Sequence, residues 1–446
     1  MSAAQANLQP VFDRSFWWFS IGFLLLMFAL FIGPRLPDDQ QATHCVVNVH
    51  LPGPFGIALN CDSHVFMRLA REPSALLEPL NILQSRPGLI FAAAPLAWAL
   101  SPLAGLAGKL GIRASRPDID PQRIDNAFAE DIPTYLAYIA LNVAIVLATF
   151  CCFRSICALW ANDGTSGNVV LTAIGFLLVT NDVVKAFVWS PHTQMFNILV
   201  PVFALYTSMR AGAGALVQRR FAIFVGIVTG LGGTAYPLFV IVLPCVAVCA
   251  FVFALRHGSR TIWSQSAINT VVLVLLALAP EALWAAFVRF MTGSFYQHEM
   301  VAFGQVTWIA DAWHQGLGTV AATWWRNLER LLRFAAPQAV PLAAVLAVVA
   351  ALGLANRGVG PNTRPSLLPL AATGILVSIV TAAFYASVGF IMPRLAYSVI
   401  PALIVVVAAA ALAVTARNNA RRQTLAFVCV AVVEAIYTIV KNGPYS

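Results

Sequence analysis

Long apolar runs separated by short polar stretches dominate the chain. Eleven of these runs have the length of a transmembrane helix, for which about 20 residues cross a hydrocarbon core of about 30 Å. The predicted spans are residues 15–33, 132–152, 168–188, 194–209, 221–235, 236–255, 265–290, 337–355, 367–389, 399–416 and 424–441. The pattern therefore predicts an all-α polytopic membrane protein of about 11 transmembrane helices.

Two polar segments interrupt this pattern and divide the chain into five parts. They are an N-terminal segment with the first span (1–33), a long loop (34–131), spans two to seven (132–290), a second loop (291–336) and spans eight to eleven (337–446). Within the long loop, residues 88–110 are apolar enough to span. Pro95 and Pro102 would each break the helical hydrogen bonding there, and a full crossing would reverse the side of every later loop. We therefore expect at 88–110 a helix or broken helix that lies in the outer interface, or one that dips into the membrane and returns.

Composition agrees with a membrane protein. Hydrophobic residues make up 60% of the chain and charged residues only 10%, with a mean hydropathy of +0.79. A soluble chain of 446 residues needs more surface charge than this. No small-residue cleavage site follows the first apolar run, which is therefore expected to stay as an anchor.

The distribution of basic residues predicts the orientation. With the N-terminus in the cytoplasm, the inner segments carry twelve Lys and Arg residues against two acidic ones, whereas the rest of the chain is close to balance. This asymmetry is the one that the positive-inside rule describes. The net charge of +9 is then explained by topology, and no basic-aromatic motif indicates a nucleic-acid partner.

The long loop contains Cys61-Asp62-Ser63-His64, the densest group of side chains able to do chemistry. Asp62 is a candidate general base and His64 a second catalytic candidate, although Asp62 also suits the N-cap of a helix at 63–71. Cys45 and Cys61 are the two cysteines of this loop. In an oxidising compartment they would pair, stabilising the loop by roughly 3 kcal/mol, and otherwise they are two separate thiols.

Two further candidates lie near the predicted third and fourth spans. His192 follows a Trp-Ser-Pro turn between them, and six of the seven histidines fall on the predicted outer side. No H-x-x-x-H or H-E-x-x-H pattern requires a metal. Lys185 and Asp182 share a helical face, so Lys185 either forms a local ion pair or meets an anionic group.

The order of these features resembles the GT-C superfamily of integral-membrane glycosyltransferases. In that family an acidic motif opens the first outer loop, as Asp62 does here. The segment Ser85-Arg86-Pro87-Gly88 resembles the motif that opens the family's interfacial helix. The segment from Phe390 to Tyr397 resembles the late outer turn that carries an arginine near the lipid phosphate. Ser63 stands where the family often has a second carboxylate, which leaves metal dependence open.

This resemblance implies transfer of a sugar from a polyprenyl-phosphate donor to a glycan, lipid or protein acceptor at the outer face of a bacterial cytoplasmic (inner) membrane. Asp62 would act as base or as ligand of a divalent metal ion. The lipid-linked sugar would be the co-substrate, and a membrane-protein partner is compatible with the resemblance. The substrate-binding candidates are Arg86, Lys185, His192, Arg394 and Tyr397.

Two other classes of function stay open. A non-catalytic lipid-binding or assembly subunit would have the same topology with a degenerate motif. A secondary transporter would also carry buried charges such as Glu281, but we find no paired inverted halves in the sequence.

Overall fold

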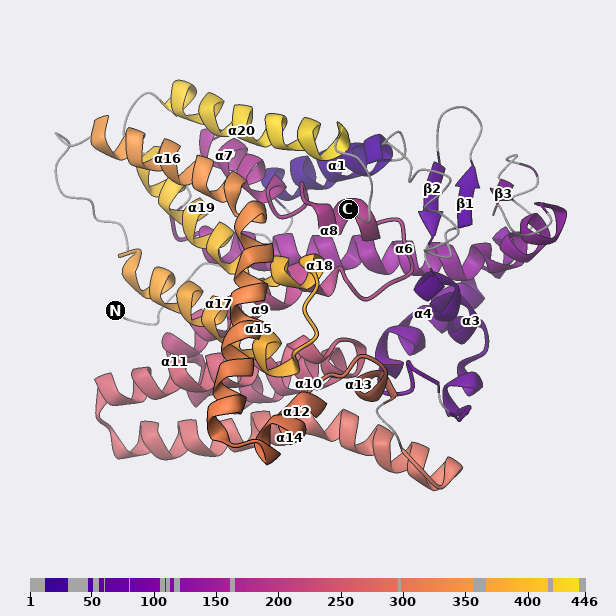
Figure 1. Ribbon diagram of the computed structural model, residues 1–446. Coiled ribbons are helices and arrows are strands. Elements are labelled where there is room, and N and C mark those ends of the chain that lie inside the picture. Colours follow the sequence, from indigo (N-terminus) through magenta and orange to yellow (C-terminus); the bar gives the residue numbers. More distant parts are fainter. Residues whose placement is uncertain are drawn as a thin grey trace.

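The computed structural model describes residues 13–30, 47–50, 56–59, 61–79, 81–104, 109, 113–115, 121–160, 165–295, 298–355, 366–415 and 420–440. These residues are mostly helical, which confirms the predicted class. Figure 1 shows α6, α9, α10 and α12 running along a common direction, while α15 crosses that direction steeply. The helix and strand bounds follow in chain order.

The first half contains α1 (Arg14–Leu30), β1 (Val47–His50), β2 (Gly56–Leu59), α3 (Cys61–Arg71), η1 (Pro73–Leu77), α4 (Pro87–Ala99), η2 (Ser101–Leu103), β3 (Arg113–Ser115), α6 (Pro121–Cys157), α7 (Thr165–Phe176), α8 (Asp182–Phe187), α9 (Phe196–Gly212) and η3 (Ala215–Val217). The second half contains α10 (Arg219–Ala235), η4 (Pro237–Ile241), α11 (Val242–His257), α12 (Arg260–Thr292), α13 (His298–Ala302), α14 (Thr307–His314), α15 (Leu317–Gln338), α16 (Val340–Ala355), α17 (Leu368–Val388), α18 (Pro393–Ala396), η5 (Tyr397–Val399), α19 (Pro401–Thr415) and α20 (Ala420–Val440).

Four helical segments among the described residues are long and apolar enough to cross a membrane. They are Glu130–Cys157, Pro237–His257, Arg260–Thr292 and Leu368–Val388. The number rises to six if each of two bent pairs is one span, Leu317–Gln338 with Val340–Leu352 and Pro393–Val399 with Pro401–Val414. The predicted count of about eleven is therefore not confirmed.

The predicted span at 168–188 shows why hydropathy and helix length differ. The structure forms two short helices there, α7 and α8, with a turn between them. The side chain of Asn181 accepts a hydrogen bond from the backbone N–H of Val184, so it caps the new helix. Hydropathy averaged over residues 168–188 does not reveal that a new helix begins after the polar residue Asn181.

In the described part of the apolar segment 88–110, which is residues 88–104 and 109, the helix is short. Helix α4 has 13 residues and ends at Ala99, before the 3-10 turn that contains Pro102. At 1.5 Å per residue its length is about 20 Å, too short to cross a hydrocarbon core of about 30 Å. Pro95 lies inside α4 without ending it, so the expected break at this proline is wrong, whereas Pro102 does lie beyond the helix end. The interfacial placement of this helix stays a prediction.

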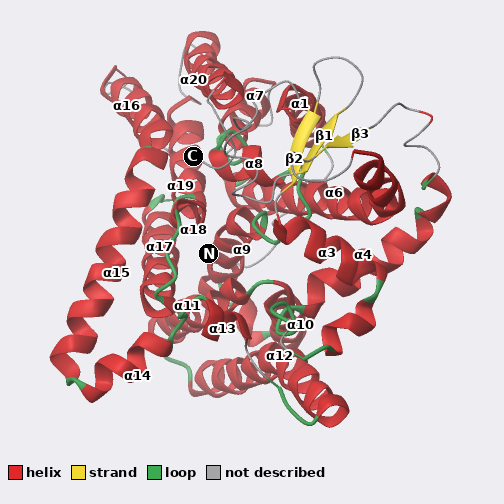
Figure 2. Ribbon diagram, turned by 45° about the vertical axis from the view of Figure 1, so that its right-hand side comes forward, coloured by secondary structure: helices red, strands yellow, loops and turns green. Residues whose placement is uncertain are grey.

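A small antiparallel sheet lies in the long polar segment, which the all-α prediction lacked. Its strand order is β2-β1-β3, with Val47 opposite Leu59 and Asn48 opposite Ser115. Figure 2 places this sheet beside α6 and close to α3 and α4. Strand β1 alternates apolar and polar residues, and its Val49 is buried together with Leu59.

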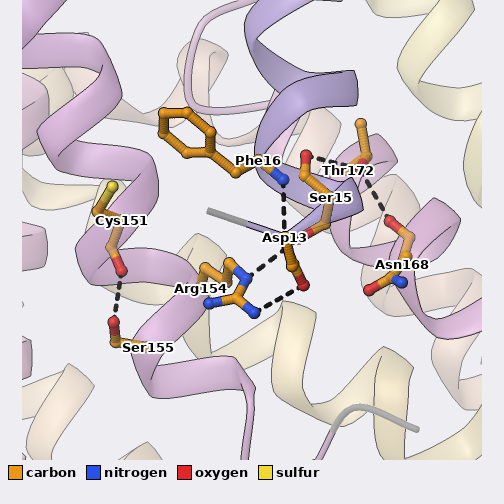
Figure 3. Close-up of polar contacts among 8 residues, drawn as sticks. All are labelled: Asp13, Ser15, Phe16, Cys151, Arg154, Ser155, Asn168 and Thr172. Atoms are coloured by element: carbon orange, nitrogen blue, oxygen red, sulfur yellow. Dashed lines mark hydrogen bonds and ion pairs between the residues drawn. The ribbon is translucent and has the colours of Figure 1, made fainter. Parts of the chain in front are cut away.

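Helix α1 is fastened to α6 by a polar cluster at its N-terminus (Figure 3). Asp13 Oδ2 accepts a hydrogen bond from Arg154 at 2.6 Å, and Asp13 Oδ1 accepts from the Ser15 hydroxyl at 2.6 Å and from the N–H of Phe16 at 3.1 Å. Burial raises the pKa of Asp13, but the hydrogen bonds from Arg154, Ser15 and Phe16 outweigh it and leave the pKa below its ordinary value. The Arg154 side chain is only 5% exposed, so its charge depends on this carboxylate.

Packing along α1 depends on close contact with α6 and α7. The Phe19 ring stacks on the Phe150 ring with centroids 3.9 Å apart. A Cβ atom at Gly22 would lie 2.4 Å from the Phe176 ring, so only glycine allows this approach. One face of the first apolar run therefore packs into the core of the helical bundle, while side chains on the other face, such as Leu25 and Phe28, are exposed.

Candidate functional site

Asp62 lies in the first turn of α3, which begins at Cys61 rather than at residue 63 as the sequence suggested. It is therefore a first-turn residue and not the residue before the helix. A negative side chain is favoured there by the unpaired N–H groups of the turn. The Asp62 side chain is 57% exposed, so its carboxylate can meet another molecule.

The partner of Asp62 is His192, 130 positions later in the chain. Nε2 of His192 lies 3.2 Å from Asp62 Oδ2, and the imidazole is 5% exposed. Nδ1 of His192 accepts the backbone N–H of Thr193 at 2.8 Å. Because Nδ1 is an acceptor, the proton of the neutral ring belongs on Nε2, where it is donated to Asp62.

Buried hydrogen bonds hold the turn that carries His192. Asn142 of α6 donates to the carbonyl groups of Phe187, Val188 and Ser190, at 3.0 to 3.2 Å. The Ser190 hydroxyl lies 2.7 Å from the hydroxyl of Ser63, which is next to Asp62. These contacts fix the turn to α3 and α6, and so they set the distance between His192 and Asp62.

The His192 ring is enclosed by two phenylalanines. Its centroid is 5.5 Å from the Phe66 ring and 4.9 Å from the Phe187 ring. An apolar enclosure disfavours the charged imidazolium. The neutral ring that the hydrogen bonds indicate is therefore also the form that the packing favours.

Arg394 reaches the same site from α18. Its guanidinium carbon lies 5.6 Å from the centroid of the Phe187 ring. Among the described residues, its Nε is buried without a hydrogen-bond partner. A partly exposed arginine with an unused, buried Nε–H donor is suited to bind an anionic group.

Arg86 reaches the site from the residue that precedes α4. Its guanidinium carbon lies 5.9 Å from the centroid of the Tyr236 ring. Gly88 allows this segment to approach the end of α10 closely, because a Cβ there would lie 2.4 Å from the Thr234 hydroxyl and 2.9 Å from the backbone nitrogen of Ala235. The segment Arg86-Pro87-Gly88 thus starts a helix and brings its arginine against Tyr236.

The charges of these four residues act on one another. The hydrogen bond from His192 lowers the pKa of Asp62, burial opposes it, and the charges of Arg394 and Arg86 lower it further. Burial lowers the pKa of His192 below its ordinary 6.5, against the opposing effect of Asp62. At neutral pH the group therefore holds one carboxylate, one neutral imidazole and two guanidinium ions. These four side chains have a net positive charge, which favours an anion, and Glu281 is a further acidic residue close enough to interact with the charge of Arg86.

The structure thus brings together four of the candidates that the sequence proposed one by one, namely Asp62, Arg86, His192 and Arg394. His64 is half-buried on α3, two positions from Asp62, so the two side chains leave the helix in different directions. The histidine that contacts Asp62 is therefore His192.

Lys185 and Tyr397 make other contacts. Nζ of Lys185 donates to the carbonyl of Ile439 at 3.3 Å, and Lys185 is two positions from Phe187, on a different face of α8. The Tyr397 hydroxyl donates to the carbonyl of Leu177 at 3.2 Å and accepts from Asn181 at 3.2 Å. Neither polar group is directed at Asp62 by these bonds.

The predicted disulfide cannot be compared with the structure. Cys45 and the side chain of Cys61 lie outside the described residues. The pairing stays a prediction.

A metal ion at Asp62 is a separate question. In the part of the chain that the structure describes, no group of three or more His, Cys, Asp or Glu side chains could hold a metal. Asp62 offers one carboxylate, Nε2 of His192 carries a proton, and two guanidinium ions lie close by. This is a poor donor set for a divalent ion. Metal dependence stays a prediction, and loss of activity with EDTA is its test.

Two buried asparagines that support the site were not recognised from the sequence. Asn142 and Asn197 lie within predicted spans, with 1% and 0% of their surface exposed. A buried amide costs free energy unless it is hydrogen-bonded, so an asparagine within an apolar run marks a place where segments meet. This signal could have identified both positions, although not their partners.

No protein-family description matches the chain, and no curated protein or solved structure is significantly similar to it.

Proposed function

We propose that the protein is a membrane glycosyltransferase that takes a sugar from a polyprenyl-phosphate donor and transfers it to an acceptor hydroxyl. The observation that carries the proposal is the ionised, half-exposed Asp62, held by His192 and accompanied by two arginines from distant segments. A base beside a phosphate-binding pair is what such a transfer requires.

In the proposed reaction, Arg86 and Arg394 bind the donor phosphate through charge-assisted hydrogen bonds. The acceptor hydroxyl donates a hydrogen bond to Asp62 and attacks the anomeric carbon. The bond from that carbon to the phosphate oxygen breaks, and its electron pair leaves with the phosphate. The hydroxyl proton passes to Asp62.

The low pKa of Asp62 has a consequence for this mechanism. A carboxylate stabilised by His192 and two arginines is ionised at neutral pH, but it is a weak base. The proton therefore moves late, when the forming bond has made the hydroxyl acidic. Stabilisation of the leaving phosphate by the arginines would then contribute most to the rate.

We further propose the membrane arrangement that the charge pattern predicts. Segments 34–131 and 291–336 would lie outside a bacterial cytoplasmic membrane, with the N-terminus in the cytoplasm and about eleven crossings. Helices too short to span by themselves, such as α7 and α9, would complete these crossings with their neighbours.

Replacement of Asp62 by asparagine tests the proposed function. With synthetic polyprenyl-phosphate monosaccharides as donors, Asp62→Asn should lower transfer about 10²–10⁴-fold, the usual contribution of a general base. Binding of polyprenyl phosphate should be nearly unchanged. Asp131→Asn is a matched control, since Asp131 pairs with Arg71 at 3.1 Å rather than with His192.

The same experiment distinguishes the alternatives. A lipid-binding or assembly subunit would bind polyprenyl phosphate in both forms and transfer no sugar in either. A transporter would move its solute across vesicles without forming a glycosidic bond. Normal turnover of Asp62→Asn would contradict the proposed role of Asp62.

A further inference from the structure

Asn197, at the start of α9, has a side chain that is completely buried and makes five hydrogen bonds. Its Nδ2 donates to Gln194 Oε1 at 2.6 Å and to the backbone carbonyl of Arg394 at 3.2 Å. Its Oδ1 accepts from three hydroxyl groups, those of Tyr236 (2.6 Å), Tyr385 (3.1 Å) and Ser398 (2.8 Å). Both amide donors and the amide oxygen are therefore in use.

These bonds connect Asn197 to both arginines of the site. The link to Arg394 is direct, through the arginine's own carbonyl group. The link to Arg86 passes through Tyr236, whose hydroxyl is held by Asn197 and whose ring lies under the Arg86 guanidinium. One buried amide therefore restrains the backbone of one arginine and the aromatic support of the other.

Asn197 also restrains the turn that carries His192. Gln194, which accepts from Asn197, is two residues after His192 in the same turn. An amide side chain can make all these bonds, because its nitrogen donates to the two carbonyl oxygens and its oxygen accepts from the three hydroxyl groups. An aspartate would lose both donated bonds, and an alanine would leave three hydroxyls and a carbonyl without this partner.

We propose that Asn197 is a positioning residue that sets the spacing of Arg86 and Arg394 for a single phosphate group of the lipid donor. This inference depends on the proposed function, since it takes the two arginines as the phosphate site. Asn197 itself does not touch the donor. Its loss changes recognition of the phosphate and leaves recognition of the isoprenoid chain intact.

The test compares two ligands and two buried asparagines. Binding of polyprenyl phosphate and of the phosphate-free polyprenol is measured on purified protein in detergent micelles. Asn269→Ala is the matched control, because Asn269 is equally buried but donates to the carbonyls of Leu216 and Val217, which belong to a different part of the fold.

Asn197→Ala should bind polyprenyl phosphate about tenfold more weakly, the effect expected if one displaced arginine loses its charge-assisted contact to the phosphate. It should bind polyprenol as the wild type does. Asn269→Ala should lower the melting temperature without changing either affinity. Tyr236→Phe keeps the ring under Arg86 and removes only the bond to Asn197. Tyr236→Phe should therefore weaken binding of polyprenyl phosphate less than Asn197→Ala does. It also keeps the inference testable if Asn197→Ala fails to fold.

Two results would overturn the inference in distinguishable ways. If the wild type prefers polyprenyl phosphate and the Asn197 and Tyr236 variants retain that preference, Asn197 does not position the arginines, and the proposed function stands. If the wild type binds both ligands equally, the phosphate site itself is wrong, and the proposed function fails together with the inference.

Discussion

Each ring nitrogen of His192 is hydrogen-bonded, and the bonds of the two nitrogens can be removed separately. Its Nε2–H donates to Asp62 and its Nδ1 accepts from the N–H of Thr193. In His192→Asn, the amide oxygen can replace Nδ1, so the bond from Thr193 is retained and the bond to Asp62 is lost. In His192→Gln, the amide nitrogen can replace Nε2, so the opposite bond is lost.

The two variants should therefore differ in effect, one on the pH dependence of the rate and the other on folding stability. In His192→Asn the pKa of Asp62 should rise, because the hydrogen bond from His192 is the largest cause of its depression. The acid limb of the rate profile then moves to higher pH. A hydrogen bond to a charged group contributes about 1.5–3 kcal/mol. The Asp62 side chain is 57% exposed and water competes for it, so we expect the lower end of this range. Because less of Asp62 is then ionised, kcat/KM should fall about tenfold at pH values within the acid limb and change little above it.

In His192→Gln the carboxylate keeps its donor, whereas the buried N–H of Thr193 loses its acceptor. The expected cost is about 1–3 kcal/mol of folding stability, with the acid limb unchanged. The assays are a pH–rate profile of kcat/KM and a thermal melt for each variant. Identical acid limbs for His192→Asn and the wild type would refute the argument that His192 holds Asp62 ionised.

The remaining predictions concern donor binding, stability and topology. Arg394→Ala should weaken binding of polyprenyl phosphate by about 10- to 150-fold. Arg326→Ala removes an exposed arginine of α15 and should leave this binding unchanged. Equal effects of the two variants would refute a specific contact of Arg394 with the phosphate. Asp13→Ala should lower folding stability by about 3–5 kcal/mol, because Arg154 is left buried without its carboxylate. In thermal melts, the double variant with Arg154→Met should recover part of this loss, and no recovery would show that the two residues are not coupled. An impermeant thiol reagent applied from outside should label Ser115→Cys and not Asn418→Cys, and the reverse pattern would invert the proposed orientation.

Most of the long helices were predictable from the sequence because they follow from apolar runs. Helix α15 was not, since it is amphipathic and lies mostly within the predicted loop 291–336, and the ends and breaks of the helices were not predictable either. The restart at Asn181 depends on one side-chain hydrogen bond to Val184, which averaging over an apolar run does not detect. The three strands are only three or four residues long. The alternation in Val47–His50 is a strand signal, but it is weak in so short a segment.

The site residues were predictable one by one, and their association was not. Asp62 and Arg394 were identified by their places in polar turns between apolar runs. The pairing of Asp62 with His192 rather than with the nearby His64 depends on Asn142, which holds the turn of His192 against α6. No periodicity in the chain encodes a contact across 130 positions. Tertiary packing alone decides it.

The central claim is that Arg86, Arg394 and Asp62 surround the reacting phosphate and sugar. A cryo-electron microscopy map of the protein with bound polyprenyl phosphate tests it most directly. The account predicts that the phosphate lies within hydrogen-bond distance, about 2.7–3.2 Å, of the Arg394 guanidinium, with Arg86 and Asp62 at the same site. Density for the phosphate elsewhere in the bundle, away from Asp62 and both arginines, would contradict it.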